Sequence, residues 1–189
     1  MYRKISIEEL KKFTESQFVE VKKSLSLRKE GLESLAGMIN ADTRKGLVIF
    51  GIAPNGNIAG IEPGNLDKAQ LTLAQYIRNK FDPPLIFNIE ILECNSKYLA
   101  FVSAERTPSI PYHEFDGRAF IREGSSTRQL SLSEKQALTK RRDRDQHNGP
   151  WRCDKCGRFV GVLINIEMSD QGMRKSYKCN CGGEYWPAI

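Results

Sequence analysis

The sequence predicts a mixed α/β (α+β) fold followed by a small module rich in cysteine. Three observations support this: short segments with the period of strands alternate with amphipathic helical segments, 40% of the 189 residues are hydrophobic, and four of the five cysteines follow position 150. Such a chain is typical of a sheet covered by helices. We expect a main domain over residues 1–140, a basic linker over 141–150 and the cysteine-bearing module over 151–189.

Local patterns predict the first half of the main domain. Ser6-Ile7-Glu8-Glu9 has the capping-box pattern and predicts a helix that begins after Ser6. Residues 18–22 alternate like a strand, and an amphipathic helix follows with Leu32, Leu35, Ala36 and Ile39 on one face. The apolar run at 47–52 is typical of a strand buried on both faces.

The second half continues the same alternation. Asn55-Gly56 predicts a hairpin turn, with a return strand at 58–61. A helix is expected over 66–81, ended by Asp82-Pro83-Pro84, and a second capping box at Ser131–Glu134 predicts a final basic helix. Further strands are expected at 87–92, 98–103 and 118–122.

The C-terminal cysteines form two close pairs, Cys153-x-x-Cys156 and Cys179-x-Cys181, separated by 22 residues. Four thiolates at such spacing suit tetrahedral, structural zinc. Segments 159–166 and 174–178 lie between the pairs and are expected to form a hairpin. The pattern predicts a zinc ribbon, with two disulfides or unrelated thiols as the alternatives.

Composition and charge narrow the function classes. No apolar run approaches the ~18–20 residues of a membrane span, and the N-terminal residues lack the apolar core of a secretory signal. We therefore expect a cytoplasmic protein without a membrane partner. Lys and Arg total 29 against 23 Asp and Glu, a formal net charge of +6, which is compatible with a polyanionic partner.

Three segments carry a family resemblance. They are Glu15–Lys22, with the form Glu-Ser-x-x-x-Glu-x-Lys; Asn40 with Gly46–Ile52 and Asn55–Ile61; and Pro108, Pro111-Tyr112 and Arg118–Thr127. In this order, over about residues 13–138, they resemble the Schlafen AlbA-like domain, once described as a divergent ATPase-type domain. No Gly-x-x-x-x-Gly-Lys-[Ser/Thr] loop supports an ATPase interpretation.

The resemblance implies a mixed sheet with flanking helices that binds RNA or DNA. In some members the domain is a metal-dependent endoribonuclease acting on tRNA or other structured RNA. Carried over, its catalytic residues would be Glu15, Glu20 and Lys22, with Mg²⁺ or Mn²⁺ as cofactor. A third acid is expected after Ile52, where Ala53 and Pro54 stand, and Asp42 or Glu62 could replace it.

We therefore predict a non-catalytic nucleic-acid-binding protein. The endoribonuclease is the alternative, and a protein-interaction adaptor that docks through the zinc ribbon is the second. Tandem domains in larger Schlafens suggest a homodimer by analogy. The candidate phosphate contacts are basic residues on both sides of the motifs: Lys22, Lys23, Arg28, Lys29, Arg44, Lys45, Arg122, Arg128, Lys140, Arg141 and Arg142.

Overall fold

The computed structural model describes residues 2–42, 44–61, 64, 66–107, 109–147, 162–169, 172–178 and 184–185, with side chains up to residue 141. The chain divides into two compact units, Met1–Leu138 and Thr139–Ile189.

A five-stranded mixed sheet organises the first unit, with strand order β1-β5-β6-β3-β2. Its strands are β1 (Arg3–Lys4), β2 (Val19–Lys22), β3 (Lys45–Phe50), β5 (Phe87–Cys94) and β6 (Lys97–Glu105). β1 pairs with β5, and β2 with β3, in parallel, whereas β6 is antiparallel to both of its neighbours, β5 and β3. The mixed α/β fold predicted from the sequence is confirmed.

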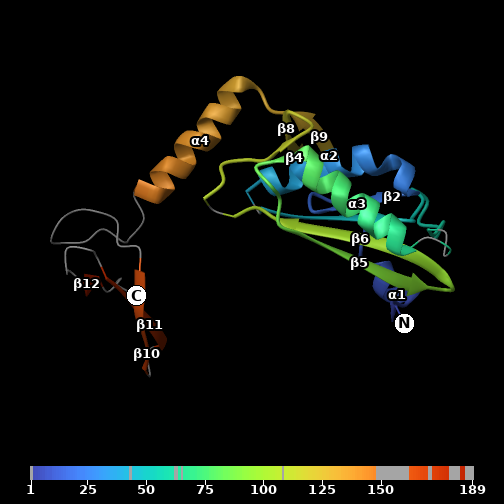
Figure 1. Ribbon diagram of the computed structural model, residues 1–189, viewed down its shortest axis with the longest axis horizontal. Helices are drawn as coiled ribbons and strands as arrows, with labels where there is room; N and C mark the ends of the chain where they lie inside the picture. The colour runs from blue at the N-terminus through green and yellow to red at the C-terminus, as the bar shows by residue number, and fades with distance from the viewer. Residues whose placement is uncertain are drawn as a thin grey trace. The chain divides into compact units, whose positions relative to one another are not determined.

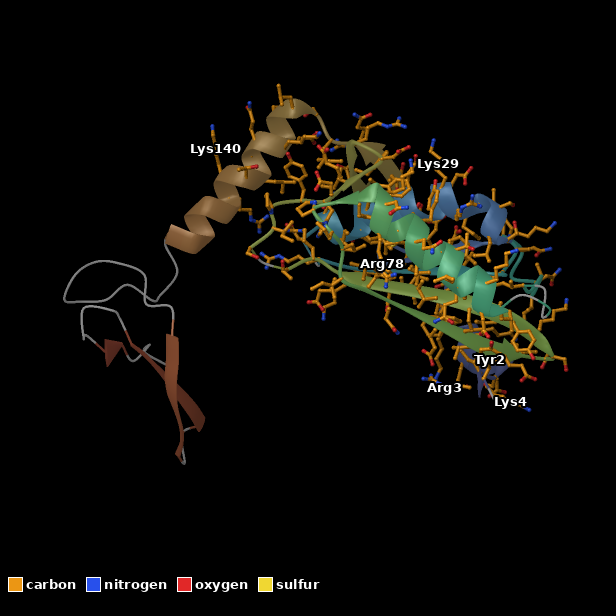
Figure 2. The ribbon with its side chains drawn as sticks, viewed as in Figure 1. Tyr2, Arg3, Lys4, Lys29, Arg78 and Lys140 are labelled. Carbon is orange, nitrogen blue, oxygen red and sulfur yellow. The ribbon has the colours of Figure 1, made fainter. Side chains whose placement is uncertain are left out.

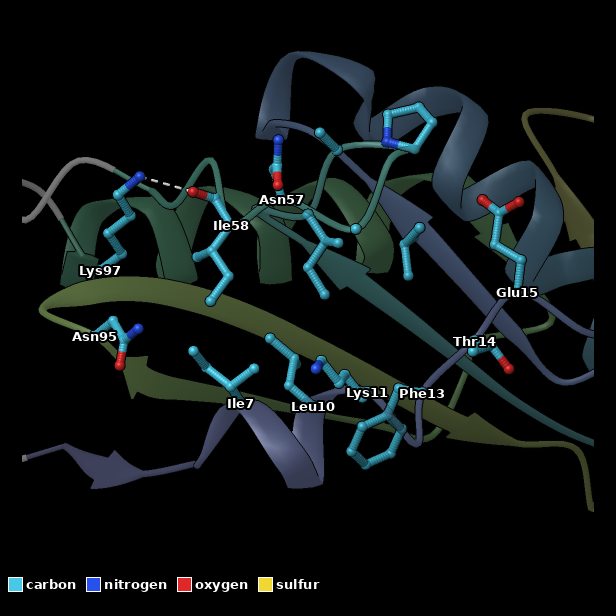
Figure 3. A pocket seen from close by; sticks show the side chains of 15 residues that line it. Ile7, Leu10, Lys11, Phe13, Thr14, Glu15, Asn57, Ile58, Asn95 and Lys97 are labelled. Atoms are coloured by element: carbon cyan, nitrogen blue, oxygen red, sulfur yellow. Dashed lines mark hydrogen bonds between the residues drawn. The ribbon is translucent and has the colours of Figure 1, made fainter.

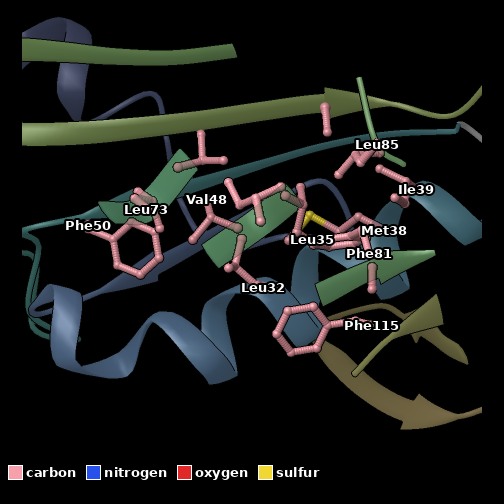
Figure 4. Packing of buried hydrophobic residues seen from close by; sticks show 14 of the residues in the cluster. Leu32, Leu35, Met38, Ile39, Val48, Phe50, Leu73, Phe81, Leu85 and Phe115 are labelled. Carbon is pink, nitrogen blue, oxygen red and sulfur yellow. The ribbon is translucent and has the colours of Figure 1, made fainter. Parts of the chain in front are cut away.

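Helices cover both faces of this sheet. The helical segments are α1 (Ile7–Leu10), η1 (Leu25–Leu27), α2 (Arg28–Asn40) and α3 (Leu66–Lys80). Figure 1 shows α2 and α3 on one side of β5 and β6, and α1 on the other. As predicted, β3 is buried on both faces. Val48 and Phe50 pack in the core under α2 and α3 (Figure 4). Ile49 packs in the core under α1.

A second, antiparallel sheet with the order β4-β7-β8-β9 packs against α2. Its strands are β4 (Phe81–Asp82), β7 (Glu114–Phe115), β8 (Arg118–Glu123) and β9 (Ser126–Gln129). Gly37 permits this close approach, because a Cβ there would lie 3.1 Å from the backbone nitrogen of Arg122. The contact brings β8 beside the edge of the first sheet.

Both predicted capping boxes form. Ser6 accepts from the Glu9 N–H at 3.1 Å while the Glu9 carboxylate accepts from the Ser6 N–H at 2.9 Å. Ser131 and Glu134 repeat the pattern at α4 (Leu132–His147), which extends through most of the segment predicted to be a linker. The predicted return strand at 58–61 does not form as a strand. The turn at Gly56 is present, with φ +81°, but residues 58–61 make only the isolated bridges Ile52–Ile58 and Ile61–Tyr98.

The second unit contains a three-stranded antiparallel sheet with the order β10-β11-β12. β10 (Val162–Ser169) and β11 (Gly172–Lys178) form the hairpin predicted for this module, and β12 (Glu184–Tyr185) pairs with β11. The four predicted zinc ligands, Cys153, Cys156, Cys179 and Cys181, lie outside the described residues.

Candidate functional site

The Glu-Ser-x-x-x-Glu-x-Lys segment forms β2 and the loop before it. The Ser16 N–H donates to the Val19 carbonyl at 2.9 Å, which leads the loop into the strand. Strand residues alternate between the two faces of a sheet. Val19 and Val21 pack in the core on the α1 side. Glu20 therefore faces the opposite side, toward α2 and β8.

Glu20 is buried there between two cations. The Glu20 Oε2 lies 2.7 Å from the Arg122 guanidinium, and the Glu20 Oε1 accepts from the Lys22 ammonium. The Arg122 side chain is 1% exposed. It also donates from Nε to the Ser16 carbonyl at 3.0 Å and from Nη1 to the Thr127 hydroxyl at 3.2 Å. This pair therefore joins β2 and its preceding loop to β8 and β9.

Glu15, the other glutamate of the motif, is exposed and lines a cleft of about 660 Å³ on the α1 side. The cleft lies between α1 and the turn at 53–58 (Figure 3). Its apolar wall is formed by Leu10, Phe13, Val21, Ile52 and Ile58, and its polar groups belong to Lys11, Thr14, Glu15, Asn57, Asn95 and Lys97. Lys97 donates to the Ile58 carbonyl at 2.7 Å, which holds the turn against β6.

The two glutamates therefore face different surroundings. Ala53 and Pro54 line the Glu15 cleft, so the fold brings Glu15 to the place where the resemblance implies a third acid. Glu20 is not among the residues that line this cleft. Asp42 follows α2, and Glu62 lies outside the described residues. Within the described ranges, no group of three or more His, Cys, Asp or Glu side chains is placed to hold a metal ion.

Several predicted phosphate contacts are engaged in ion pairs within the domain. Lys22 and Arg122 pair with Glu20, and Lys45 lies 3.5 Å from Glu105. Arg128 contacts both Glu123 at 2.6 Å and Glu134 at 2.7 Å. These contacts raise the pKa of Arg128, and the hydrogen bond from Arg128 is the largest of the effects that lower the pKa of Glu134 to about 2.

The remaining predicted contacts differ in their surroundings. Lys23, Lys29 and Arg44 make no ion pair within the described part of the chain. Arg28 lies over the Tyr76 ring, with its guanidinium carbon 4.9 Å from the ring centroid. Lys140 and Arg141 lie in α4 in the second unit, and the side chain of Arg142 is outside the described set.

Asn40, which belongs to the second motif, has a structural role. Its side-chain amide donates to the carbonyls of His113 at 2.8 Å and Phe120 at 2.9 Å, and its oxygen accepts from the His113 N–H at 2.8 Å. The His113 ring is buried and lies 2.7 Å from the Pro83 carbonyl, and burial lowers the pKa of His113. The Asn40 side chain therefore holds the end of α2 to the second sheet, and the His113 ring joins the residues beside β7 to those beside β4.

The sequence did not single out Lys11, Asn57 or Lys97 as residues of the Glu15 cleft. The signal for Asn57 was the Asn-Gly turn, which indicated a hairpin but not which residues it faces. Lys11 and Lys97 reach the cleft only because α1 and β6 pack beside that turn.

A mixed sheet covered by helices, with a glutamate motif at its edge strand, defines an α/β domain of the type that the resemblance implied. The family model described as Schlafen, AlbA_2 matches residues 15–131, more than half of the chain. The chain belongs to this family.

Two solved structures are similar to the chain. The DIP2311 protein from Corynebacterium diphtheriae is 13% identical with a TM-score of 0.47; the match covers 81% of this chain and 26% of that one, so this chain spans about a quarter of that protein. The N-terminal domain of a putative ATP-dependent DNA helicase RecG-related protein from Nitrosomonas europaea is 23% identical with a TM-score of 0.45, covering 67% of this chain and 91% of that domain. At these values neither likeness bears on function.

No curated protein matches the chain at the level required for a relative. Among the helices that the structure describes, none has the length and apolar character to cross a membrane.

Proposed function

We propose that this protein binds nucleic acid through its phosphates and does not use Glu15 and Glu20 as a nuclease centre. One observation carries the second half of the proposal: both oxygens of Glu20 are in contact with cations, Oε1 with Lys22 and Oε2 with Arg122. A metal ion would have to displace these cations and leave the buried Arg122 charge without its partner, which is costly.

Two properties support the nucleic-acid part. The chain belongs to the Schlafen AlbA_2 family, and its formal net charge is +6. The exposed Lys23 and Lys29 and the half-buried Arg44 make no ion pair within the described residues. Unpaired surface cations are the groups that contact phosphates and release counterions.

Fluorescence anisotropy with labelled tRNA and labelled duplex DNA tests the binding. We expect at least one of them to bind at ~50 mM salt, and the logarithm of the affinity to fall linearly with the logarithm of salt concentration. Comparing the two probes also assigns the preferred nucleic acid. No binding of either probe at this salt concentration would refute the proposal.

The endoribonuclease alternative is tested separately, because Glu15 lies in the 660 Å³ cleft. The protein is incubated with tRNA and Mn²⁺, and Glu15→Gln is the matched variant. We expect no cleavage by either protein. Cleavage by the unaltered protein that Glu15→Gln abolishes would show that the cleft is an active site and would overturn the non-catalytic proposal.

We also propose that the second unit holds one zinc ion through Cys153, Cys156, Cys179 and Cys181. The β10–β11 hairpin supports this, because Val162 pairs with Lys178 and Cys179 directly follows that pair. Cys153 and Cys156 precede the first residue of β10 in the sequence, and Cys179 and Cys181 follow the last residue of β11. These two strand ends are paired with each other. Metal analysis should give one zinc per chain, and Cys179→Ser should lose it. Zinc-free protein with disulfide-linked cysteines would contradict this assignment.

A further inference from the structure

The face of the first unit formed by α2 and α3 carries a row of cations. On α3, Lys68, Thr72, Tyr76 and Lys80 recur every four residues and so lie along one ridge, which is inclined to the helix axis. This ridge adjoins the buried positions Leu73 and Ile77. At about 1.5 Å per residue, Lys68 and Lys80 are roughly 18 Å apart along the helix.

The start of α2 adds Arg28 and Lys29 to this row. Arg28 stacks over the Tyr76 ring at 4.9 Å and donates to the Leu25 carbonyl at 3.4 Å, so its guanidinium is held against α3. Arg28, Lys68 and Thr72 line a hollow of about 240 Å³ with an apolar base. The hollow therefore offers two positive charges and a hydroxyl to an anionic group.

The other end of the row is the Asp116-Gly117 turn between β7 and β8. The Lys80 ammonium lies 2.6 Å from the Asp116 carboxylate. The hydrogen bond from Lys80 is the largest effect that lowers the pKa of Asp116, and the charges of Lys29 and Arg118 lower it further. Lys29, Lys80 and Arg118, from three different elements, therefore all act electrostatically on one carboxylate.

We call this set the α2–α3 cationic row; it consists of Arg28, Lys29, Lys68, Lys80 and Arg118. Asp116 offsets one of its five charges. Asp67 is engaged with the Tyr2 hydroxyl at 3.0 Å, and in the described part of the chain Glu30 and Glu33 of α2 form no ion pair with the row. Figure 2 shows Lys29 on the helical face of the domain. Arg78 is excluded because it stacks on Phe87 of β5 instead.

We propose that the α2–α3 cationic row binds the phosphodiester backbone of a nucleic acid, which places this contact on the opposite side of the sheet from the Glu15 cleft. This inference rests on the function proposed above. Phosphates fit the row better than bases do, because the face of Tyr76 is covered by Arg28 and Phe115 is buried. Along the helix axis a duplex strand has one phosphate per 3.4 Å, so about 18 Å of that axis includes roughly five phosphates of one strand.

Two triple variants with the same loss of charge test the site. The first is Lys29→Gln, Lys68→Gln and Arg118→Gln, which leaves the Lys80–Asp116 pair intact. The matched control is Lys4→Gln, Lys11→Gln and Lys12→Gln, which removes three exposed cations near α1, including one that lines the Glu15 cleft. Both proteins are compared with the unaltered protein for tRNA and duplex DNA at several salt concentrations, with thermal melting to show that they fold.

We expect the first variant to bind about tenfold more weakly or worse, with a salt slope reduced by about 2 to 3, since each lost phosphate contact removes roughly one counterion. The control should change affinity less than about threefold, because it alters only the general field of the protein. A control that weakens binding as much as the first variant would overturn the assignment of the row while the proposed function stands. If the unaltered protein binds neither probe, the proposed function itself fails.

Discussion

The first unit uses ion pairs in its interior and unpaired cations on its helical face. At β2 and β8, Glu20 and Arg122 are 8% and 1% exposed in their side chains and contact each other at 2.7 Å. On the α2–α3 face, Lys29, Lys68 and Arg118 are exposed and make no ion pair within the described residues. Residues of the same chemical kind thus hold the fold together in one region and are available to a ligand in the other.

This difference shows why a charge count alone does not locate a binding surface. A buried ion pair has given up its hydration, so removing one partner leaves an uncompensated charge in the interior. An exposed cation keeps its water and contributes little to stability. The interior region should therefore respond to substitution through stability, and the helical face through binding.

Glu20→Gln should have the largest effect on stability. We expect it to lower the free energy of unfolding by about 3 kcal/mol, because Arg122 then remains buried without its carboxylate. Urea denaturation measures the change. Glu15→Gln is the matched control from the same motif, and since Glu15 is exposed we expect a change within about 0.5 kcal/mol.

The double variant Glu20→Gln, Arg122→Gln separates the pair from other effects. Its loss in free energy of unfolding should be smaller than the sum of the losses of the two single variants. The reason is that each single variant leaves one member of the pair buried and charged, whereas the double variant removes both charges. Equal stability of Glu20→Gln and the unaltered protein would show that this pair does not hold β8 to β2. The distinction between interior and surface charges would then fail at its main example.

Asn40→Ala should have the next largest effect. The substitution removes three buried hydrogen bonds and leaves the His113 N–H and the carbonyls of His113 and Phe120 unpaired. We expect a loss of about 2–3 kcal/mol, measured in the same denaturation experiment. Asn40→Asp keeps the acceptor oxygen but cannot donate, so it should be no more stable than the alanine variant. An aspartate variant as stable as the unaltered protein would contradict these hydrogen bonds.

Local patterns in the sequence were sufficient to predict much of the fold. The structure confirmed the capping boxes at Ser6 and Ser131 and the helix that contains Leu32 and Leu35. It also confirmed the buried strand predicted at 47–52, which is found at Lys45–Phe50. Each of these features depends on residues that are close in the sequence. The return strand at 58–61 was wrong as a strand, since Ile58 bridges to Ile52 and Ile61 bridges to Tyr98 of β6, so no continuous pairing with one partner forms. β1 and β9 were missed because each is a short strand recognisable only from its partner.

The candidate site was less predictable. The motif singled out Glu15 and Glu20 as candidate residues, but it did not show that Arg122, far away in the sequence, would contact Glu20. In the cationic row, Arg28 and Lys29 were expected as phosphate contacts, and Lys68 and Lys80, twelve residues apart, both fall within a predicted helix. Arg118 joins them only because the β7–β8 turn packs beside α3.

The smallest expected effect comes from the exposed ion pair between Arg128 and Glu134, which contrasts with the buried pair of Arg122 and Glu20. The Glu134 pKa is lowered to about 2 by Arg128 and by the Ser131 N–H and hydroxyl. A carboxyl group with a lowered pKa stabilises the folded state above its ordinary pKa of 4.5, and this contribution is lost as the pH falls toward 2.

Comparing the urea midpoints of Glu134→Gln and the unaltered protein from pH 6 to pH 2 measures this contribution. The difference between them should be small at pH 6, because solvent screens this pair, and should shrink as the pH falls. A difference that grows toward pH 2 would reverse the sign of the linkage and would show that Glu134 does not act as a carboxylate acceptor at the start of α4.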